Sequence, residues 1–94
     1  MAGAGAPTII DYPGAGNVNT RVGSINDRDD FVGRYDDATG QTHVFCLCNG
    51  SYTTVDPPGA VYAQEGGINN AGQITGTYST DGNNSIGFVR DGPQ

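Results

Sequence analysis

An internal repeat constrains the fold of this chain of 94 residues more than any other feature. The segment "SINDRDDFVGRYDDATGQTHVFCLCNG" aligns with "GINNAGQITGTYSTDGNNSIGFVRDG", and Tyr35 and Phe45 recur 43 residues later as Tyr78 and Phe88. Repeats of this length occur in β-propeller blades and in some helical arrays. The chain is therefore expected to fold as two similar units, and the residue pattern decides between strands and helices.

The pattern within each unit predicts β-structure. Alternating segments such as "DFVGRYDD", "THVFCLC" and "QITGTYS" are strand-like, and turn-forming clusters such as "DATG", "CNGS" and "TDGNN" separate them. The predicted strands of the first unit are residues 22–25, 31–36, 42–48 and 51–55. The Asn-Gly pair in "CNGS" predicts a tight hairpin, because such turns need positive φ. Asn26 and Asn69 are expected to stabilise equivalent turns through side-chain to backbone hydrogen bonds.

The chain begins with a copy of the end of its own repeat. "PTIIDYPGA" matches "TTVDPPGA", with Asp11 in the place of Asp56, and the chain stops after "GFVRDGPQ" without a third such segment. We therefore predict that residues 8–15 form a closing strand, which completes the last unit as strands from both chain ends complete one blade of a closed propeller. Two units cannot close a ring of 4–8 blades, so oligomerisation would close the ring or a smaller sandwich.

The predicted fold is thus all-β, with two four-stranded propeller-like units in one domain over residues 1–94. Its parts are a flexible lead-in at 1–7, the closing strand at 8–15, the first unit at 22–60 and the second at 61–92, which lacks its own fourth strand. Only 35% of the residues are hydrophobic, so one chain can build only a thin core. We expect a homo-oligomer, either a dimer or a trimer.

Charge and hydropathy exclude several classes of partner. The net charge is −6 with four Lys and Arg residues in all, which disfavours nucleic acid and anionic lipid because both bind clustered cations. No apolar run approaches the roughly 20 residues that cross a bilayer, so no membrane insertion is expected. The start "MAGAGAPTII" lacks the basic and apolar regions of a signal peptide. The location of the protein stays open at this level.

Few residues are suited to catalysis or to metal binding. Cys46 and Cys48 would lie about 6.5–7 Å apart on one face of a strand, which is long for a disulfide and favours free thiols. His43 is the only histidine and there is no second cysteine pair, so we predict no metal and no cofactor. The acidic pairs fall in turns, where carboxylates stay solvated and ionised, and glycoside hydrolysis would need one raised pKa. We predict that the protein is not an enzyme.

The repeat resembles the HAF-type repeats of predicted bacterial extracellular proteins. The pattern is "INxxGQIxGxY", then "hxF", then "TxxDxPGA", carried by Ile68, Asn69, Gly72, Gln73, Ile74, Gly76, Tyr78, Phe88, Thr53, Asp56, Pro58, Gly59 and Ala60. The first unit departs from it with Asp29 and Asp30 at the Gly and Gln positions. The resemblance implies a β-propeller-like array at the cell surface or outside the cell, with no defined activity. In organisation the chain is also similar to small two-repeat oligomeric bacterial lectins, although it has no tryptophan to stack on a sugar.

Polar residues in the segments between units suggest carbohydrate binding. Sugar hydroxyls are held by planar Asp, Asn, Gln and Arg groups, while an aromatic face covers the sugar ring. The candidates are Asn17, Asn19, Arg21, Arg34, Asp36, Tyr62, Gln64 and Glu65. We therefore predict a lectin for a mannose- or galactose-type glycan, made multivalent by homo-oligomerisation. The alternative is a non-enzymatic structural or protein-interaction module with no small-molecule ligand.

Overall fold

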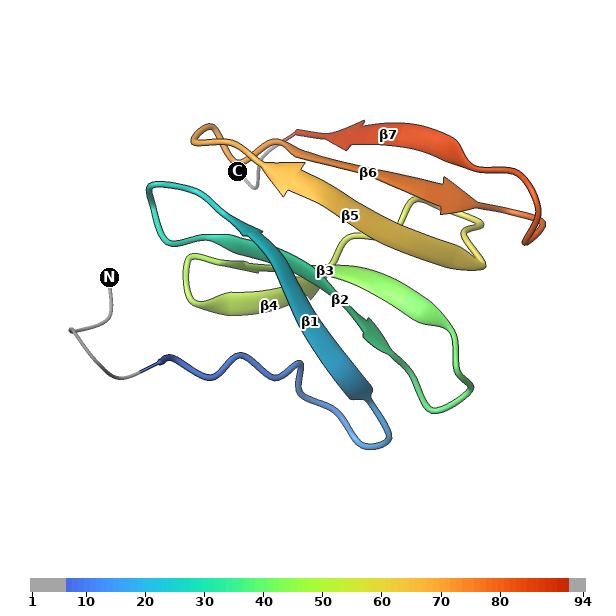
Figure 1. Ribbon diagram of the computed structural model, residues 1–94, viewed down its shortest axis with the longest axis horizontal. Helices are drawn as coiled ribbons and strands as arrows, with labels where there is room; N and C mark the ends of the chain where they lie inside the picture. The colour runs from blue at the N-terminus through green and yellow to red at the C-terminus, as the bar shows by residue number, and fades with distance from the viewer. Residues whose placement is uncertain (1–6, 92–94) are drawn as a thin grey trace.

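Seven antiparallel strands form two sheets in the computed structural model, which describes residues 7–91 (Figure 1). The first sheet contains β1 (Val18–Ile25), β2 (Phe31–Asp36), β3 (Thr42–Cys48) and β4 (Ser51–Thr54), and the second contains β5 (Tyr62–Ile68), β6 (Ile74–Ser79) and β7 (Ile86–Arg90). This confirms the all-β prediction, although β1 begins four residues before the predicted strand. The described residues contain no helix that could span a membrane.

The Asn-Gly hairpin forms as predicted between β3 and β4. Asn49 and Gly50 have φ values of 54° and 79°, and Cys48 pairs with Ser51 across the turn. A positive φ at both central residues matches the right-handed twist of the flanking strands. The hairpin therefore fixes the register between these two strands.

The turns that follow β1 and β5 are also alike, as the repeat predicts. The side-chain oxygens of Asn26 and Asn69 each accept the backbone N–H groups two and four residues further on, at 2.9–3.0 Å. Asp29 and Gly72 occupy the same position and share a positive φ, 61° and 83°. Asp29, which stands in the first unit where the second has Gly72, therefore leaves the turn conformation unchanged. The predicted role of both asparagines is confirmed.

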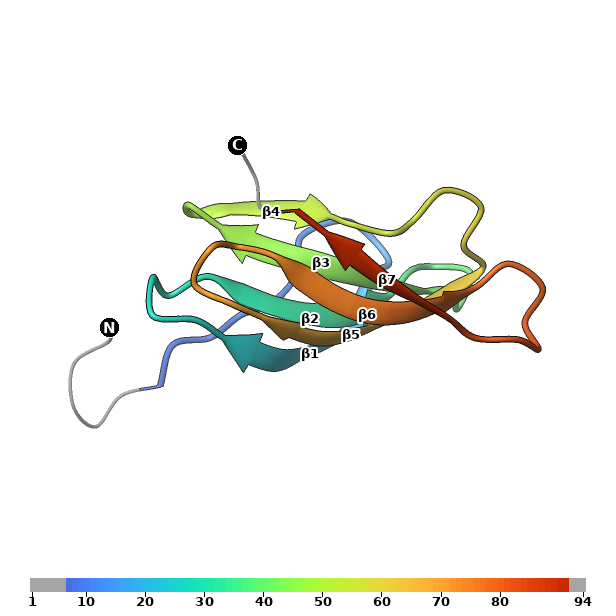
Figure 2. The ribbon, with the colours of Figure 1, turned by 90° about the horizontal axis from the view of Figure 1, so that it is seen from above.

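The two sheets pack face to face, with β5 lying across β1, β2 and β3 (Figures 1 and 2). The core between them is made by Val32, Val44, Cys46, Cys48, Val55, Ala63 and Ile74, with Tyr78 and Phe88 packed against it. Tyr78 and Phe88 thus face the first sheet. Their repeat equivalents are Tyr35 and Phe45. Phe45 is next to the core residue Val44 on β3, and Tyr35 is next to Arg34, which pairs with Val44. Because neighbours along a strand point to opposite sides, both aromatic side chains point away from the core between the sheets. The units therefore pack front to back, like consecutive members of an array.

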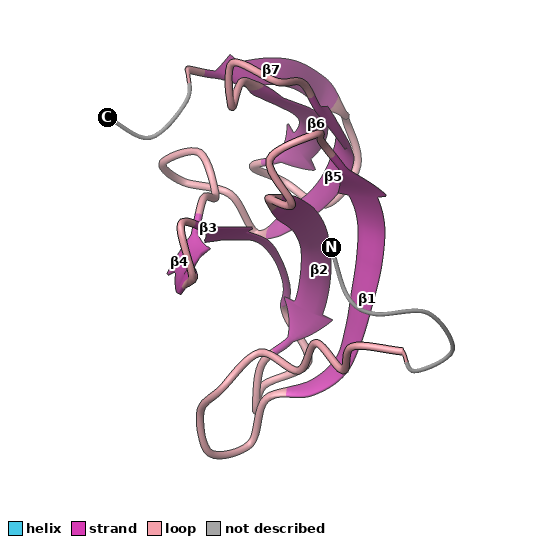
Figure 3. Cartoon of the chain, turned by 90° about the vertical axis from the view of Figure 1, so that its left-hand side faces the viewer, coloured by secondary structure: helices cyan, strands magenta, loops and turns pink. Residues whose placement is uncertain are grey.

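The side of the first sheet that faces away from the second carries an aromatic cluster, here called the aromatic face, formed by Tyr35, Phe45 and Tyr52. Tyr12 covers it, with its ring stacked on that of Tyr35 at 3.9 Å and 8°. Residues 8–15 form no strand in this single chain and run along the first sheet, far from β7 (Figures 1 and 3). Within one chain the predicted closing strand is therefore not formed, and its pairing with another copy stays a prediction.

Cys46 and Cys48 form a disulfide along β3, which corrects the expectation of two free thiols. Their Cα atoms are 5.5 Å apart, within the usual range for a disulfide. The expectation assumed the full rise of an extended strand, whereas β3 is shorter between these two residues. Both side chains are buried in the core between the sheets.

Candidate functional site

Five of the eight predicted site residues gather where β1 and β2 meet β5. We call this set, Asn19, Arg21, Arg34, Asp36 and Glu65, the polar band. The register pairs Arg21 with Arg34, and Asp36 follows two residues later on the same side of β2. Asn19 has a φ of 58° at an irregularity of β1 between Val18 and Arg21. The polar band therefore lies on the core-facing side of the first sheet, where that side reaches solvent.

Asp36 is the centre of the exposed part of the polar band. Its carboxylate accepts hydrogen bonds from Asn19 Nδ2 at 3.0 Å, Arg21 Nη2 at 3.2 Å and Thr42 Oγ1 at 2.7 Å. These bonds, those from Asn19 and Thr42 above all, lower the pKa of Asp36 below its ordinary value. The carboxylate is ionised at neutral pH, so it can accept a hydrogen bond but cannot act as a general acid.

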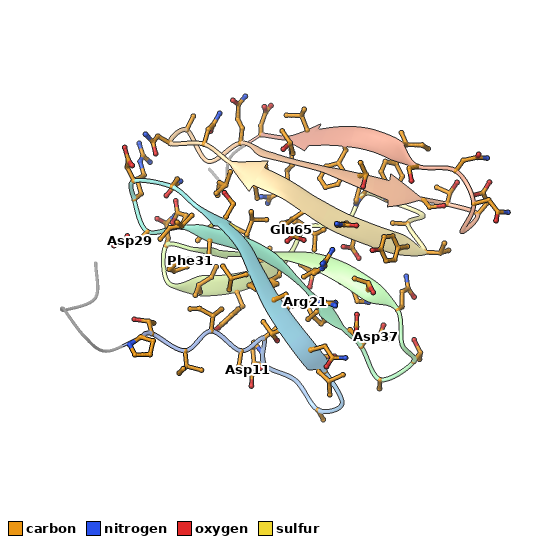
Figure 4. The ribbon with its side chains drawn as sticks, in the orientation of Figure 1. Asp11, Arg21, Asp29, Phe31, Asp37 and Glu65 are labelled. Atoms are coloured by element: carbon orange, nitrogen blue, oxygen red, sulfur yellow. A yellow bond between two sulfur atoms is a disulfide. The ribbon has the colours of Figure 1, made fainter. Side chains whose placement is uncertain are left out.

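The inner part of the polar band is an ion pair that joins the two sheets. Arg34 Nε and Glu65 Oε1 lie 4.0 Å apart, and the Glu65 side chain is only 10% exposed. Both atoms are buried and have no hydrogen-bond partner among the described residues. Gly23 makes room for the carboxylate, because a Cβ at this position would overlap it. Figure 4 shows Arg21 and Glu65 on the two strands that meet at this junction.

The other three predicted residues lie elsewhere. Tyr62 and Gln64 alternate with Ala63, which is buried in the core, and so they point to the outer side of the second sheet, where Tyr62 OH donates to Gln64 Oε1 at 3.1 Å. Asn17 donates to Pro13 O at 3.1 Å, in the loop before β1. Gln64 is nevertheless the repeat equivalent of Arg21, because it pairs with Thr77 as Arg21 pairs with Arg34. Tyr62, the aromatic residue predicted for the site, therefore lies on the outer side of the second sheet, away from the polar band.

A histidine between two carboxylates forms a second polar cluster, which the sequence did not predict. His43 Nε2 lies 2.7 Å from Asp37 Oδ2, and His43 Nδ1 contacts Asp56 Oδ2. Burial opposes protonation of His43, but the hydrogen bonds to both carboxylates outweigh it and raise its pKa. The other oxygen of Asp56 accepts the N–H of Val44 at 2.8 Å. Asp56 belongs to the repeated D-x-P-G-A motif, which is the signal that could have located this cluster.

The His43 cluster is suited to holding the structure together and not to catalysis. Both imidazole nitrogens are engaged, so neither is available to take a proton from a substrate. Hydrogen bonds, from Thr39 first and then His43, hold the pKa of Asp37 well below its usual range. The cluster ties the turn between β2 and β3 to the segment after β4. Among residues 7–91 there is no group of three His, Cys, Asp or Glu residues placed to bind a metal ion.

No protein-family model, curated protein sequence or solved structure matches this chain.

Proposed function

We propose that the protein is a non-enzymatic carbohydrate-binding protein and that the polar band is its binding site. The observation that supports this proposal most directly is the pair of buried atoms without hydrogen-bond partners, Arg34 Nε and Glu65 Oε1, beside an exposed group of donors and acceptors. Buried polar groups are nearly always paired, so an unpaired donor and acceptor side by side are unusual. A ligand that both donates and accepts would satisfy them.

A sugar hydroxyl has this property, because its oxygen accepts and its proton donates. A hydroxyl near the Arg34–Glu65 pair would accept from the guanidinium and donate to the carboxylate, after a small movement of either side chain. Neighbouring hydroxyls would reach Asn19, Arg21 and the ionised Asp36. One such shallow site binds weakly, and several sites in a homo-oligomer would add avidity. The proposed ligand is a glycan of the mannose or galactose type.

Glycan-array screening, followed by calorimetry with the best glycan, tests this proposal. Arg21→Ala removes an exposed donor of the polar band and is expected to weaken binding at least about tenfold, which is about 1.4 kcal/mol. Asn17→Ala is the control, because Asn17 lies in the loop outside the band. Equal affinity of the two variants would contradict the site, and absence of binding to any glycan would contradict the function.

The alternative is a structural or protein-interaction module without a small-molecule ligand. The free edge of β7 favours it, since no strand among the described residues pairs with that edge. Assembly of the chain with no binding to any glycan would support this alternative. Either function agrees with the proposed place outside the cell or at its surface, which rests on the resemblance to HAF-type repeats.

A further inference from the structure

We propose that residues 8–11 of one copy of the chain pair with β7 of a second copy and become the fourth strand of its second sheet. This inference is independent of sugar binding, since it concerns the opposite edge of the sheet from β5. In the single chain the edge of β7 is open, and the proposed pairing gives this edge a partner strand, a register and a set of hydrogen bonds.

The second sheet ends at an open edge of β7, whereas in the first sheet the equivalent edge is paired with β4. The strand orders are β1-β2-β3-β4 and β5-β6-β7, and β7 is the repeat equivalent of β3. In the described chain β3 pairs with β4 on the side where β7 has no neighbour. The exposed fractions of Ile86 and Val89 on β7 are 45% and 66%. An edge with exposed apolar side chains is a template for another strand.

The first sheet shows how the missing strand would pair. Phe45 lies opposite Thr54, Val55 N–H donates to Val44 O at 2.9 Å, and the carboxylate of Asp56 accepts the N–H of Val44 at 2.8 Å. The segment "TIID" (residues 8–11) has the same relation to β7 that "TTVD" (residues 53–56) has to β3.

This template assigns the register between the two copies. Ile9 of the donor would lie opposite Phe88 of the acceptor. Ile10 N–H would donate to Gly87 O, and the Asp11 carboxylate would accept Gly87 N–H. The two contacts to the backbone of Val44 would then recur at Gly87, whereas the side-chain contacts of His43 and Thr54 would not, because Ile86 and Ile9 take their places.

A groove along β7 fits the donated side chains. It has a volume of about 350 Å³ and is lined by residues 54–58 on one side and by Phe88, Val89 and Arg90 on the other. Ile9, which is 80% exposed in the single chain, takes the place of Thr54 and would share the inner side of the sheet with Phe88. Donation would therefore bury the most exposed large apolar side chain of the described chain in an apolar groove.

The donor must be a second copy, because the donor segment and β7 lie on opposite sides of the first sheet (Figure 1). In its own chain the segment is held through side chains: Asp11 N–H donates to Tyr52 OH at 3.3 Å, Tyr12 N–H donates to Thr20 Oγ1 at 3.0 Å, and the Tyr12 hydroxyl lies 2.8 Å from Thr54 Oγ1. It forms no ladder of backbone hydrogen bonds with residues 7–91, so a strand edge offers it more backbone partners.

The front-to-back packing of the two units also leaves one surface of each unit exposed, and these two surfaces are complementary. Asn26 Nδ2 donates to Asn69 O at 2.8 Å, and Asp27 N–H donates to Asn70 Oδ1 at 2.8 Å, so each contact joins positions that are one repeat apart. Such front-to-back packing is heterologous and continues until a ring closes. The aromatic face of one copy and the outer side of the second sheet of another are the surfaces that would meet next.

Disulfide trapping between two variants, each with one cysteine added to the Cys46–Cys48 pair, tests the register. Ile9→Cys is mixed with Phe88→Cys, which we expect to lie directly opposite it, and in parallel with Val89→Cys, whose side chain points to the other side of β7. Because each variant carries one of the two new cysteines, a bond between them can form only between copies. We expect mass spectrometry to show a covalent heterodimer in the first mixture and much less of it in the second.

The mass of the unmodified protein in solution gives an independent readout. Sedimentation velocity is expected to show at least twice the 9.7 kDa of one chain, and Ile10→Pro, which removes the N–H donated to Gly87 O, is expected to shift the population to the monomer. A monomer at every concentration, or equal trapping in both mixtures, would overturn the proposal. Neither outcome depends on whether a sugar binds.

Discussion

Replacement of Gly33 by alanine tests the close approach of β1 to β2 beneath an aromatic ring. A Cβ at Gly33 would overlap the backbone carbonyl oxygen of Arg21 and meet Phe45 Cε1 at 3.0 Å. Phe45 is fully buried and the carbonyl belongs to the neighbouring strand, so neither can move away freely. Overpacking of a core costs about 1–3 kcal/mol, and the upper half of that range applies where backbone must shift. Gly33→Ala is therefore expected to lower the free energy of unfolding by about 2–3 kcal/mol.

Urea unfolding followed by far-UV circular dichroism measures this loss. With a slope of about 1 kcal/mol per molar urea for a small domain, the midpoint should fall by about 2–3 M. Gly87→Ala is the matched control, because the nearest heavy atom to its new Cβ is 4.0 Å away and its φ is not positive. That variant should gain about 0.4–1 kcal/mol from the smaller entropy of its unfolded chain. A Gly33→Ala midpoint within about 0.5 M of the wild type would refute the reasoning.

Two further predictions concern the His43 cluster and Tyr12. The raised pKa of His43 means that its contribution to stability is complete below the ordinary value of 6.5 and is lost as the pH rises through the folded-state pKa. The urea midpoint of the wild type should therefore fall as the pH rises above the ordinary value of 6.5, and His43→Gln should show a smaller fall over the same interval. Tyr12→Ala removes a ring stack worth about 0.5–1.5 kcal/mol that holds the donor segment on its own chain, so sedimentation should show up to about tenfold stronger assembly. Weaker assembly of Tyr12→Ala would instead show that Tyr12 belongs to the interface.

Local structure could be predicted from the sequence where one residue type satisfies one backbone requirement. The Asn49-Gly50 hairpin and the turns at Asn26 and Asn69 depend on positive φ and on short side-chain hydrogen bonds, which are local properties. The predicted polar residues separated into two groups because strand alternation places Glu65 and Gln64 on opposite sides of β5. Only the packing of the second sheet on the first decides which side of β5 faces the first sheet and so which of these two residues joins the polar band.

The position of the donor segment depends on more than the residues that form it. The same motif is an ordered continuation of β4 after Thr54, where a partner strand in the same chain is adjacent, and an extended segment without a strand at its first occurrence. The difference comes from topology, because β3 lies beside residues 53–56 whereas β7 lies across the first sheet from residues 8–11 (Figure 1). A solvated segment with two apolar residues can bury them and gain backbone hydrogen bonds by pairing with a free edge of matching sequence. Under the proposed pairing, a second copy therefore supplies the strand edge that residues 8–11 do not meet in their own chain.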